Sequence, residues 1–295
     1  MSVTSIQQAA ENQLGTSVFP IPLDACRIQR PYLLERAGLS MTSTALFFAV
    51  PYLIAADAYA PDRNLSLYAI PRDYHLYIRE LAERVLPALR ALFPDVVMAL
   101  FSDHSPLIEG EAAARAGMGV LGKNHLLITP EYGSFVFVAE LIVGADYETV
   151  TEHARAPFPA QPPVCPGCGA CSRACPATNR SGHIVRNCLS ALTQKKGDLS
   201  AEEKRFLLQS PLVWGCDTCQ LVCPLNRAAL SGMHDTPIDF FREQRIRHLT
   251  SEKLAAMSDD DFRERAFAWR GRDTIRRNLI MRAEKPSPHT EESVC

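Results

Sequence analysis

The sequence predicts an α+β fold in which a larger domain of mixed helices and strands precedes a smaller, cysteine-rich domain. Short apolar runs alternate with a long amphipathic stretch over residues 1–154. Residues 155–164 contain four prolines, and eight cysteines follow between Cys165 and Cys223. Hydrophobic residues make up 47% of the 295-residue chain, which is enough for a core without metals or disulfides. We expect domains at 1–154 and 155–235, a helical segment at 236–284 and a disordered tail at 285–295.

The elements of the first domain follow from its hydrophobic spacing. Runs of apolar residues predict strands at 47–52, 96–101, 125–129 and 134–143. Residues 74–92 carry leucines and valines at helical spacing, but Pro87 interrupts them, so we expect a kink or two helices. Residues 106–116 predict another helix, which ends in a glycine-rich turn.

Bulk charge and the opening residues bear on location and partners. The net charge of -2 gives no overall attraction to nucleic acid or to an anionic membrane. The polar opening has no apolar run of signal-peptide length, and no stretch approaches the ~20 apolar residues of a membrane span. We therefore expect a cytoplasmic protein that makes no membrane contact. Thiols stay reduced there, so metal or cluster ligation explains the cysteines better than disulfides.

The cysteine spacing predicts two 4Fe-4S clusters. Cys165, Cys168, Cys171 and Cys175, followed by Pro176, form the C-x2-C-x2-C-x3-C-P run in which the fourth cysteine binds the other cluster. A second run has Val213 where its first cysteine would stand, and Cys188 is the one remaining cysteine of the region. The exchange of fourth ligands then gives two sets of four: Cys165, Cys168, Cys171 and Cys223, and Cys175, Cys188, Cys216 and Cys219.

Structural zinc is the alternative explanation of the C-x2-C pairs, but zinc sites usually show two such pairs about 12–20 residues apart. A triple run ending in C-P favours clusters. Cys26 and Cys295 are remote in sequence, and we interpret them as bystanders, one buried and one on the tail. Two neighbouring clusters form an electron relay, which indicates one-electron chemistry at a partner cofactor.

Two further features precede the cysteines. Asp103 ends a predicted strand shortly before a predicted helix, and its carboxyl group suits a general acid if burial raises its pKa. Composition alone favours a helix N-cap. Gly117, Gly119 and Gly122 permit close approach of a ligand, and Lys123 can contact a phosphate or amide.

Several motifs occur in a fixed order over residues 68–278. They are Tyr68, Ala69, Asp73, Tyr74 and His75 (YA...DYH), Asp103, Pro106 and Glu109 (D-x-x-P-x-x-E), AGMGVLGKN, Gly133-Ser134, the cysteines with Leu189 and Ser190, GCDTCQLVCPLN, and Arg270, Gly271, Arg277 and Asn278. This ordered series resembles the epoxyqueuosine reductase family of cobalamin-dependent iron–sulfur enzymes, which complete queuosine in tRNA. The chain resembles a short form without the helical-repeat extension that many members use to hold tRNA.

The resemblance implies a flavin-reductase-like, cobalamin-binding first domain and a ferredoxin-like domain with two 4Fe-4S clusters. The clusters would pass electrons to cobalt, low-valent cobalt would reduce an epoxide to an alkene, and Asp103 would donate the proton. The partners implied are tRNA and an external low-potential electron donor, and a monomer is favoured. The cofactor contacts implied are His75, Asp103, Gly117, Gly119, Lys123, Asn124, Ser190 and Asp217.

Some positions depart from the family pattern. The substitutions are Ile70-Pro71, His104-Ser105, Ala191 and Leu225, so a related enzyme that reduces another substrate is one alternative. An electron carrier without a substrate is another. A late basic run can meet tRNA phosphates or form a solvated face balanced by Asp261, Glu264 and Asp273. Its members are Arg263, Arg265, Arg270, Arg272, Arg276, Arg277 and Arg282.

Overall fold

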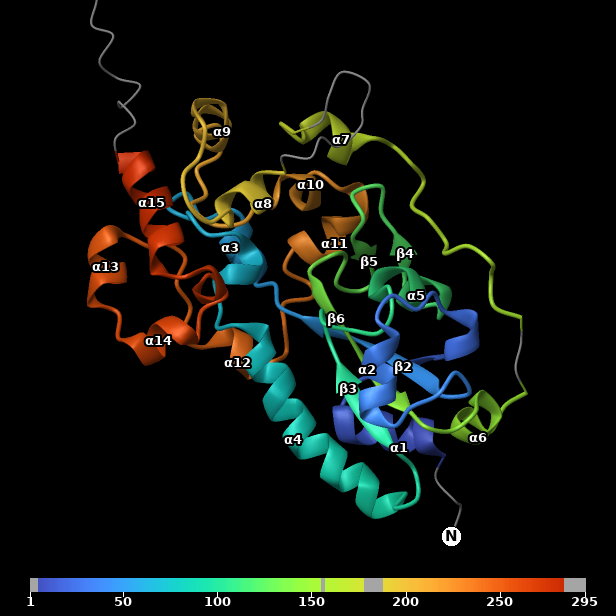
Figure 1. Cartoon of the computed structure of the whole chain (residues 1–295). Helices are drawn as coiled ribbons and strands as arrows, with labels where there is room; N and C mark the ends of the chain where they lie inside the picture. Colours follow the sequence, from blue (N-terminus) through green and yellow to red (C-terminus); the bar gives the residue numbers. More distant parts are fainter. Residues whose placement is uncertain (1–4, 155–156, 178–187, 284–295) are drawn as a thin grey trace, which may run out of the picture. The chain divides into compact units, whose positions relative to one another are not determined.

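The computed structural model describes residues 5–154, 157–177 and 188–283 (Figure 1). Contacts divide the chain into two units, each built from three separate stretches. Unit 1 comprises Met1–Leu53, Tyr74–Cys168 and Pro224–Ile238, and unit 2 comprises Ile54–Asp73, Gly169–Cys223 and Asp239–Cys295.

These units differ from the contiguous segments expected from the sequence, because residues 54–73 form their polar contacts within unit 2. The Arg63 guanidinium pairs with Asp217 at 2.5 Å, and Asn64 Nδ2 donates to the Leu249 carbonyl at 2.7 Å. Residues 224–238, in turn, pack within unit 1. The division expected from the sequence remains a prediction, with segments at 1–154, 155–235, 236–284 and 285–295. Residues 284–295 lie outside the described part of the chain.

Unit 1 contains a four-stranded sheet in the order β1-β2-β6-β3, in which every neighbouring pair is antiparallel. The strands are β1 (Phe19–Pro22), β2 (Thr44–Pro51), β3 (Met98–Phe101) and β6 (Val136–Val143). A short hairpin pairs β4 (Val120–Leu121) with β5 (Leu127–Ile128). The strands predicted at 47–52, 96–101 and 134–143 are therefore confirmed, whereas the one at 125–129 is reduced to β5. A mixed fold with an antiparallel sheet agrees with the expected α+β class.

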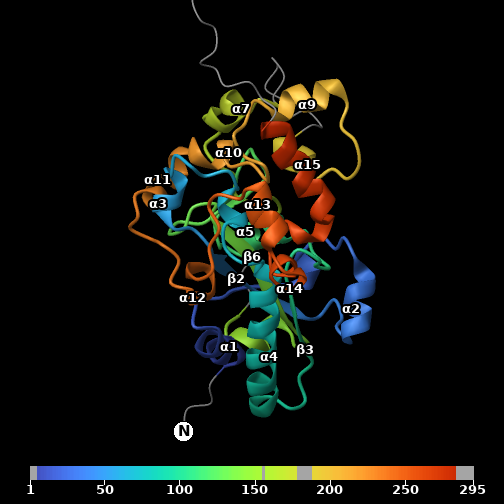
Figure 2. The ribbon, with the colours of Figure 1, turned by 90° about the vertical axis from the view of Figure 1, so that its left-hand side faces the viewer.

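The helices of unit 1 are α1 (Ile6–Leu14), α2 (Pro31–Ala37), α4 (Tyr74–Leu92), α5 (Glu109–Arg115), α6 (Tyr147–Thr151) and α11 (Arg227–Leu230). Helix α1 packs against α4, as Figures 1 and 2 show. Pro87 lies inside α4, so the predicted division into two helices is wrong. Leu81, Val85 and Leu89 bury one face of α4, and this packing outweighs the hydrogen bond that Pro87 cannot donate.

Helix α5 is shorter than the predicted 106–116. Pro106 precedes it, and the Pro106 carbonyl accepts hydrogen bonds from the backbone N–H groups of Gln29 and Arg30 at 2.8 and 3.1 Å. The core of unit 1 lies between α5 and the sheet and contains Ile21, Leu34, Phe47, Leu107, Ala113, Met118 and Ile142. This core fixes the start of α5 against β6.

Unit 2 is mainly helical, as expected for the residues after Cys223. Its α-helices are α3 (Ala55–Ala58), α7 (Ala170–Ala174), α8 (Leu189–Thr193), α9 (Ala201–Leu207), α10 (Thr218–Leu221), α12 (Asp239–Arg242), α13 (Ser251–Ala256), α14 (Asp259–Arg263) and α15 (Arg272–Ala283). The described residues of both units also form the 3-10 helices η1 (Leu23–Ala25), η2 (Leu67–Ala69), η3 (Pro224–Asn226) and η4 (Ala268–Arg270).

Asn278 joins separate stretches of unit 2. Its Nδ2 donates to the carbonyl oxygens of Thr193 and Val213, at 2.7 and 2.9 Å. The fully buried Trp214 follows Val213 and meets the ring of Phe267 edge to face. In the described part of the chain, no helix combines the length and apolar character needed to cross a membrane.

Candidate active site

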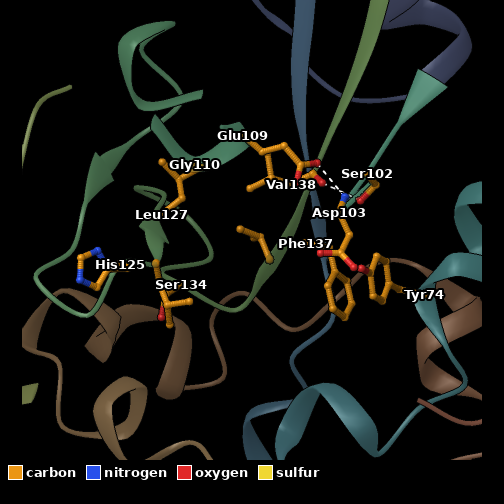
Figure 3. Close-up of a pocket in the computed structure, with 12 residues that line it drawn as sticks. Tyr74, Ser102, Asp103, Glu109, Gly110, His125, Leu127, Ser134, Phe137 and Val138 are labelled. Carbon is orange, nitrogen blue, oxygen red and sulfur yellow. Dashed lines mark hydrogen bonds between the residues drawn. The ribbon is translucent and has the colours of Figure 1, made fainter. Parts of the chain in front are cut away.

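A pocket of about 360 Å³ opens in unit 1 (Figure 3). It lies among the first residue of α4, the loop after β3, the first turn of α5, strand β6 and the turn between β4 and β5. Its lining residues are Tyr74, Ser102, Asp103, Glu109, Gly110, His125, Leu126, Leu127, Ser134, Val136, Phe137 and Val138. The motifs YA...DYH and D-x-x-P-x-x-E therefore meet at one site, although they are separate in the sequence.

Asp103 lies on the loop that follows β3. Its backbone has a φ of 64°, a left-handed conformation that costs about 1–3 kcal/mol in a residue with a side chain. The Ser102 hydroxyl donates to the Val138 carbonyl at 2.7 Å, and the Asp103 N–H donates to Glu109 Oε1 at 2.8 Å. Because the residue that caps α5 is Ile108, the N-cap interpretation of Asp103 is wrong.

The Asp103 carboxyl group is 74% exposed, and its Oδ2 lies 3.7 Å from His75 Nε2. Hydrogen bonding to His75, with a further contribution from Tyr74, lowers the pKa of Asp103. Burial therefore does not raise this pKa, which was the condition set for the general-acid interpretation, because exposure leaves the charged form solvated and His75 stabilises it. The Tyr74 ring stacks on Phe137, with centroids 3.9 Å apart, and this holds the start of α4 beside Asp103.

The glycine-rich motif contributes a turn to the pocket. A Cβ on Gly119 would lie 2.3 Å from the Ile128 carbonyl oxygen, so this glycine allows β4 and β5 to pair. Gly117 has a φ of 92° and open space around it. Lys123 is exposed, and Asn124 Oδ1 accepts from the Leu126 N–H at 3.4 Å. The members of this turn that line the pocket are His125 and Leu126, neither of which was expected as a site residue.

Asn226 is a second residue that the sequence analysis did not single out. It follows the last C-P pair and belongs to unit 1. Its Oδ1 accepts from the Ser134 N–H at 2.9 Å, and its Nδ2 donates to Ser134 Oγ at 2.8 Å. Both side chains are buried, so Asn226 positions one wall of the pocket. The signal available in the sequence was its place in the motif GCDTCQLVCPLN.

The cysteines predicted to bind clusters occupy both units. In unit 2, α7 carries Cys171, α10 carries Cys219, and the two helices pack together. Burial raises the pKa of Cys216, and the nearby Cys188 thiol contributes in the same direction. Cys216 also packs against the apolar cluster of Leu189, the residue after Cys188, so the two cysteines lie in the same part of unit 2. Within the described residues, no three His, Cys, Asp or Glu side chains are arranged to hold a metal ion.

Of the two cysteines outside the run, Cys26 lies in the described part of the chain. Burial raises the pKa of Cys26 to about 12, so this thiol stays protonated at neutral pH. Its Sγ lies 3.5 Å from the Pro22 carbonyl oxygen. Cys295 lies outside the described residues.

The two predicted cofactor contacts in unit 2 are engaged with protein groups. Asp217 is 1% exposed, pairs with Arg63 and accepts from the Leu67 N–H. These contacts hold Asp217, the residue directly after Cys216, in place. Ser190 Oγ accepts from Gln194 Nε2 at 3.2 Å. Their contact with a cofactor stays a prediction.

The late basic run divides into arginines that bind backbone carbonyls and arginines that form exposed ion pairs. Arg282 donates to the carbonyl oxygens of Ser210, Leu207 and Leu212, and Arg277 donates to those of Lys195 and Gly197. Arg265 and Arg272 also bind backbone carbonyls. Arg263 and Arg276 instead form exposed pairs with Asp260 and Asp273. Much of the run therefore joins segments of unit 2, a role that neither sequence interpretation included.

Comparison with known proteins identifies the relatives of this chain. Residues 164–226 match the family described as the 4Fe-4S double cluster binding domain. The epoxyqueuosine reductase of Listeria monocytogenes is 37% identical over 216 residues, which cover 71% of this chain and 54% of that protein. That of Gloeobacter violaceus is 32% identical over 234 residues, which cover 78% of this chain and 70% of that protein. The chain spans about half the length of several curated relatives that it matches.

Solved structures give the same family. The epoxyqueuosine reductase of Streptococcus thermophilus superposes with a TM-score of 0.66 at 22% identity, over 94% of this chain and 79% of that one, which shows the fold. An epoxyqueuosine reductase with an epoxyqueuosine-modified tRNA-Tyr stem loop superposes with a TM-score of 0.58 at 28% identity, over 81% of this chain and 63% of that one. The chain matches the double-cluster domain, carries the family's motifs in order, and covers 70% of the Gloeobacter violaceus enzyme at 32% identity. It therefore belongs to the epoxyqueuosine reductase family.

Proposed function

We propose that this protein is an iron–sulfur oxidoreductase that reduces the epoxide of epoxyqueuosine to the alkene of queuosine in tRNA. The observation that carries the proposal is the meeting of Tyr74 and Asp103 at one pocket, with His75 beside Asp103, since these residues belong to two motifs of the family. The chain's relatives carry the same activity in their names. One relative is solved with an epoxyqueuosine-modified stem loop, which supports tRNA as the partner.

The chain's own residues have distinct roles in this proposal. Cys165, Cys168, Cys171 and Cys223 bind one cluster, and Cys175, Cys188, Cys216 and Cys219 bind the other. The double-cluster match and the proximity of Cys188 to Cys216 support this assignment. An external low-potential donor supplies the electrons.

Cobalamin, when bound, supplies the low-valent cobalt that reduces the epoxide. Two of the cofactor contacts that the resemblance implies are open to a ligand, since the Asp103 carboxyl group is exposed and Gly117, outside the pocket lining, has open space around it. The pocket volume of about 360 Å³ suits the reacting part of a substrate, not a whole corrinoid. Asp103 donates a proton to the departing oxygen. Because His75 lowers the pKa of this exposed carboxyl group, the carboxylate first takes up that proton from solvent, and Tyr74 and His75 hold it in position.

The test is epoxide reduction by the anaerobically reconstituted protein. Cobalamin, a strong reductant and an epoxyqueuosine-containing stem loop are supplied, and the nucleosides are analysed after digestion. Queuosine is the expected product. Asp103→Asn should lower the rate by about 10²–10⁴, whereas Asp95→Asn, which changes an exposed carboxyl group outside the pocket, should not. If epoxyqueuosine is unchanged by the wild-type protein, the proposed function is wrong.

A further inference from the structure

The proposed reaction needs more protons than Asp103 can supply in one turnover. Reduction of an epoxide to an alkene breaks both C–O bonds and releases the oxygen as water. The change consumes two electrons, which the external donor provides, and two protons. Asp103 supplies one proton when the first C–O bond breaks, and a second acid at the same pocket would supply the other without waiting for Asp103 to be protonated again.

Glu109 is a pocket-lining carboxyl group beside Asp103 (Figure 3). It is the first residue of α5, and its Oε1 accepts the Asp103 N–H at 2.8 Å. This bond fixes the side chain of Glu109 at the pocket wall. Its carboxyl group therefore reaches the space that the substrate would occupy.

Glu140 lies behind Glu109 in the interior of unit 1. It is 0% exposed and stands in β6, opposite Phe47 of β2 and Phe101 of β3. The Ser105 hydroxyl donates to Glu140 Oε1. The other oxygen, Oε2, is buried without a hydrogen-bond partner among the described residues. A charged carboxylate with one unpartnered oxygen is very costly in such surroundings, so Glu140 is held as the neutral acid.

Burial favours retention of a proton by this pair, although the Asp103 N–H lowers the pKa of Glu109 and the Ser105 hydroxyl lowers that of Glu140. Burial raises the pKa of Glu140 well above its ordinary value, and the negative charge of Glu109 adds to the rise. Burial also raises the pKa of Glu109, to about 7, with a contribution from the Asp103 charge. Arg30 is the cation that opposes these effects at Glu109, and Cys26 is the other titratable group near Glu140. Two interacting carboxyl groups titrate as a pair.

We propose that Glu109 and Glu140 form a proton store that delivers the second proton of the reaction into the pocket. This inference rests on the proposed function. Glu109 gives its proton to the oxygen after the second C–O bond breaks, which completes the water molecule. Glu140 and the Glu109 carboxylate then share the proton that remains, so that no charge is left on Glu140 alone, and the pair regains one proton from solvent before the next turnover.

Ser105 orients the buried acid. The Ser105 hydroxyl donates to Glu140 Oε1. The same hydroxyl accepts from the Leu107 N–H at 2.9 Å, so its orientation is fixed. The Ser105→Ala variant therefore changes the surroundings of Glu140 without removing the acid.

The first experiment detects the buried acid without any turnover. Infrared spectra of the anaerobic protein are recorded from pH 5 to pH 9 in deuterated and ordinary water. The wild-type protein should show the carbonyl band of a protonated carboxyl group above pH 7, and Glu140→Gln should lose it. Ser105→Ala should keep the band but move it to higher frequency, because the carbonyl loses a hydrogen bond. A band that is equal in all three proteins would overturn the proposal.

The second experiment measures single-turnover epoxide reduction against pH. Glu109→Gln and Glu140→Gln keep the shape and hydrogen-bonding capacity of the side chains but cannot supply a proton. Each should lower the rate by about 10²-fold or more, and the fall of the wild-type rate above about pH 7 should disappear in Glu109→Gln. Stem-loop affinity should not change.

The matched control is Glu111→Gln, on the same helix but paired with Arg27 at 3.6 Å. If both test variants follow Glu111→Gln at every pH, the proton store is refuted. A wild-type protein that shows the infrared band but reduces no epoxide would instead refute the proposed function, and the delivery role would fall with it. The two failures are thereby distinguished.

Discussion

Replacement of Glu109 by glutamine should change the pH dependence of folding stability by an amount that the structure predicts. In the folded protein the pKa of Glu109 is about 7, against an ordinary value of 4.5. The folded state therefore retains a proton between these values that the unfolded chain has released. The free energy of unfolding of the wild type falls as pH rises through this window, by roughly 2–3 kcal/mol.

Glutamine cannot ionise, so the variant escapes this loss. Its side-chain carbonyl can still accept the Asp103 N–H, which preserves the loop. Thermal unfolding of the anaerobic, cluster-loaded protein is measured from pH 5 to pH 8. Since about 1 kcal/mol shifts the unfolding midpoint by roughly 2–4 °C in units of this size, Glu109→Gln should gain roughly 5 °C on the wild type at pH 8. At pH 5 the gain should be small.

The comparison with Glu111→Gln removes general effects of a lost charge on α5, and its midpoint should stay close to that of the wild type throughout. A midpoint difference between Glu109→Gln and the wild type that is constant from pH 5 to pH 8 would refute the reasoning. So would a difference that is larger at pH 5.

Three further predictions test the clusters and unit 2. Cys188→Ser should retain about half of the iron of the wild type in a metal analysis, because one cluster of two loses a ligand, whereas Cys26→Ser should retain all of it. Arg282→Ala should lower the free energy of unfolding by roughly 2–3 kcal/mol, since its guanidinium binds three backbone carbonyls; Arg276→Ala, which removes an exposed pair, should cost less than about 1 kcal/mol in the same melt. Gly215→Ala should lose iron on purification, because φ is +73° and a Cβ would collide with the Ser66 side chain.

Local patterns predicted the elements of unit 1 well. Apolar runs gave β2, β3 and β6, and helical spacing gave α4, because burial of these faces is decided by side chains close together in sequence. Cysteine spacing predicted the double-cluster domain, since cluster geometry constrains the ligand positions directly.

Properties that depend on distant partners could not be predicted. The pKa of Asp103 is lowered mainly by His75, which comes from another element. The sequence does not show that these two residues pair. Glu140 stands in the apolar run VFVAELIV, where one carboxylate among buried residues was the available signal. The contact of Asn226 with Ser134 joins residues 92 positions apart. Arg277 and Arg282 look like a solvated face until the carbonyl groups that they bind are known.

The return of residues 224–238 to unit 1 has a consequence for synthesis on the ribosome. Thr236 is fully buried, and it donates from its N–H to the Leu53 carbonyl and from Oγ1 to the Pro51 carbonyl, each at 2.7 Å. These bonds close the end of β2 with residues translated about 185 positions later. Unit 1 therefore cannot complete its packing while the nascent chain ends before Thr236. All eight cysteines of the run are translated before Thr236, so the whole predicted ligand set is present before unit 1 can finish packing.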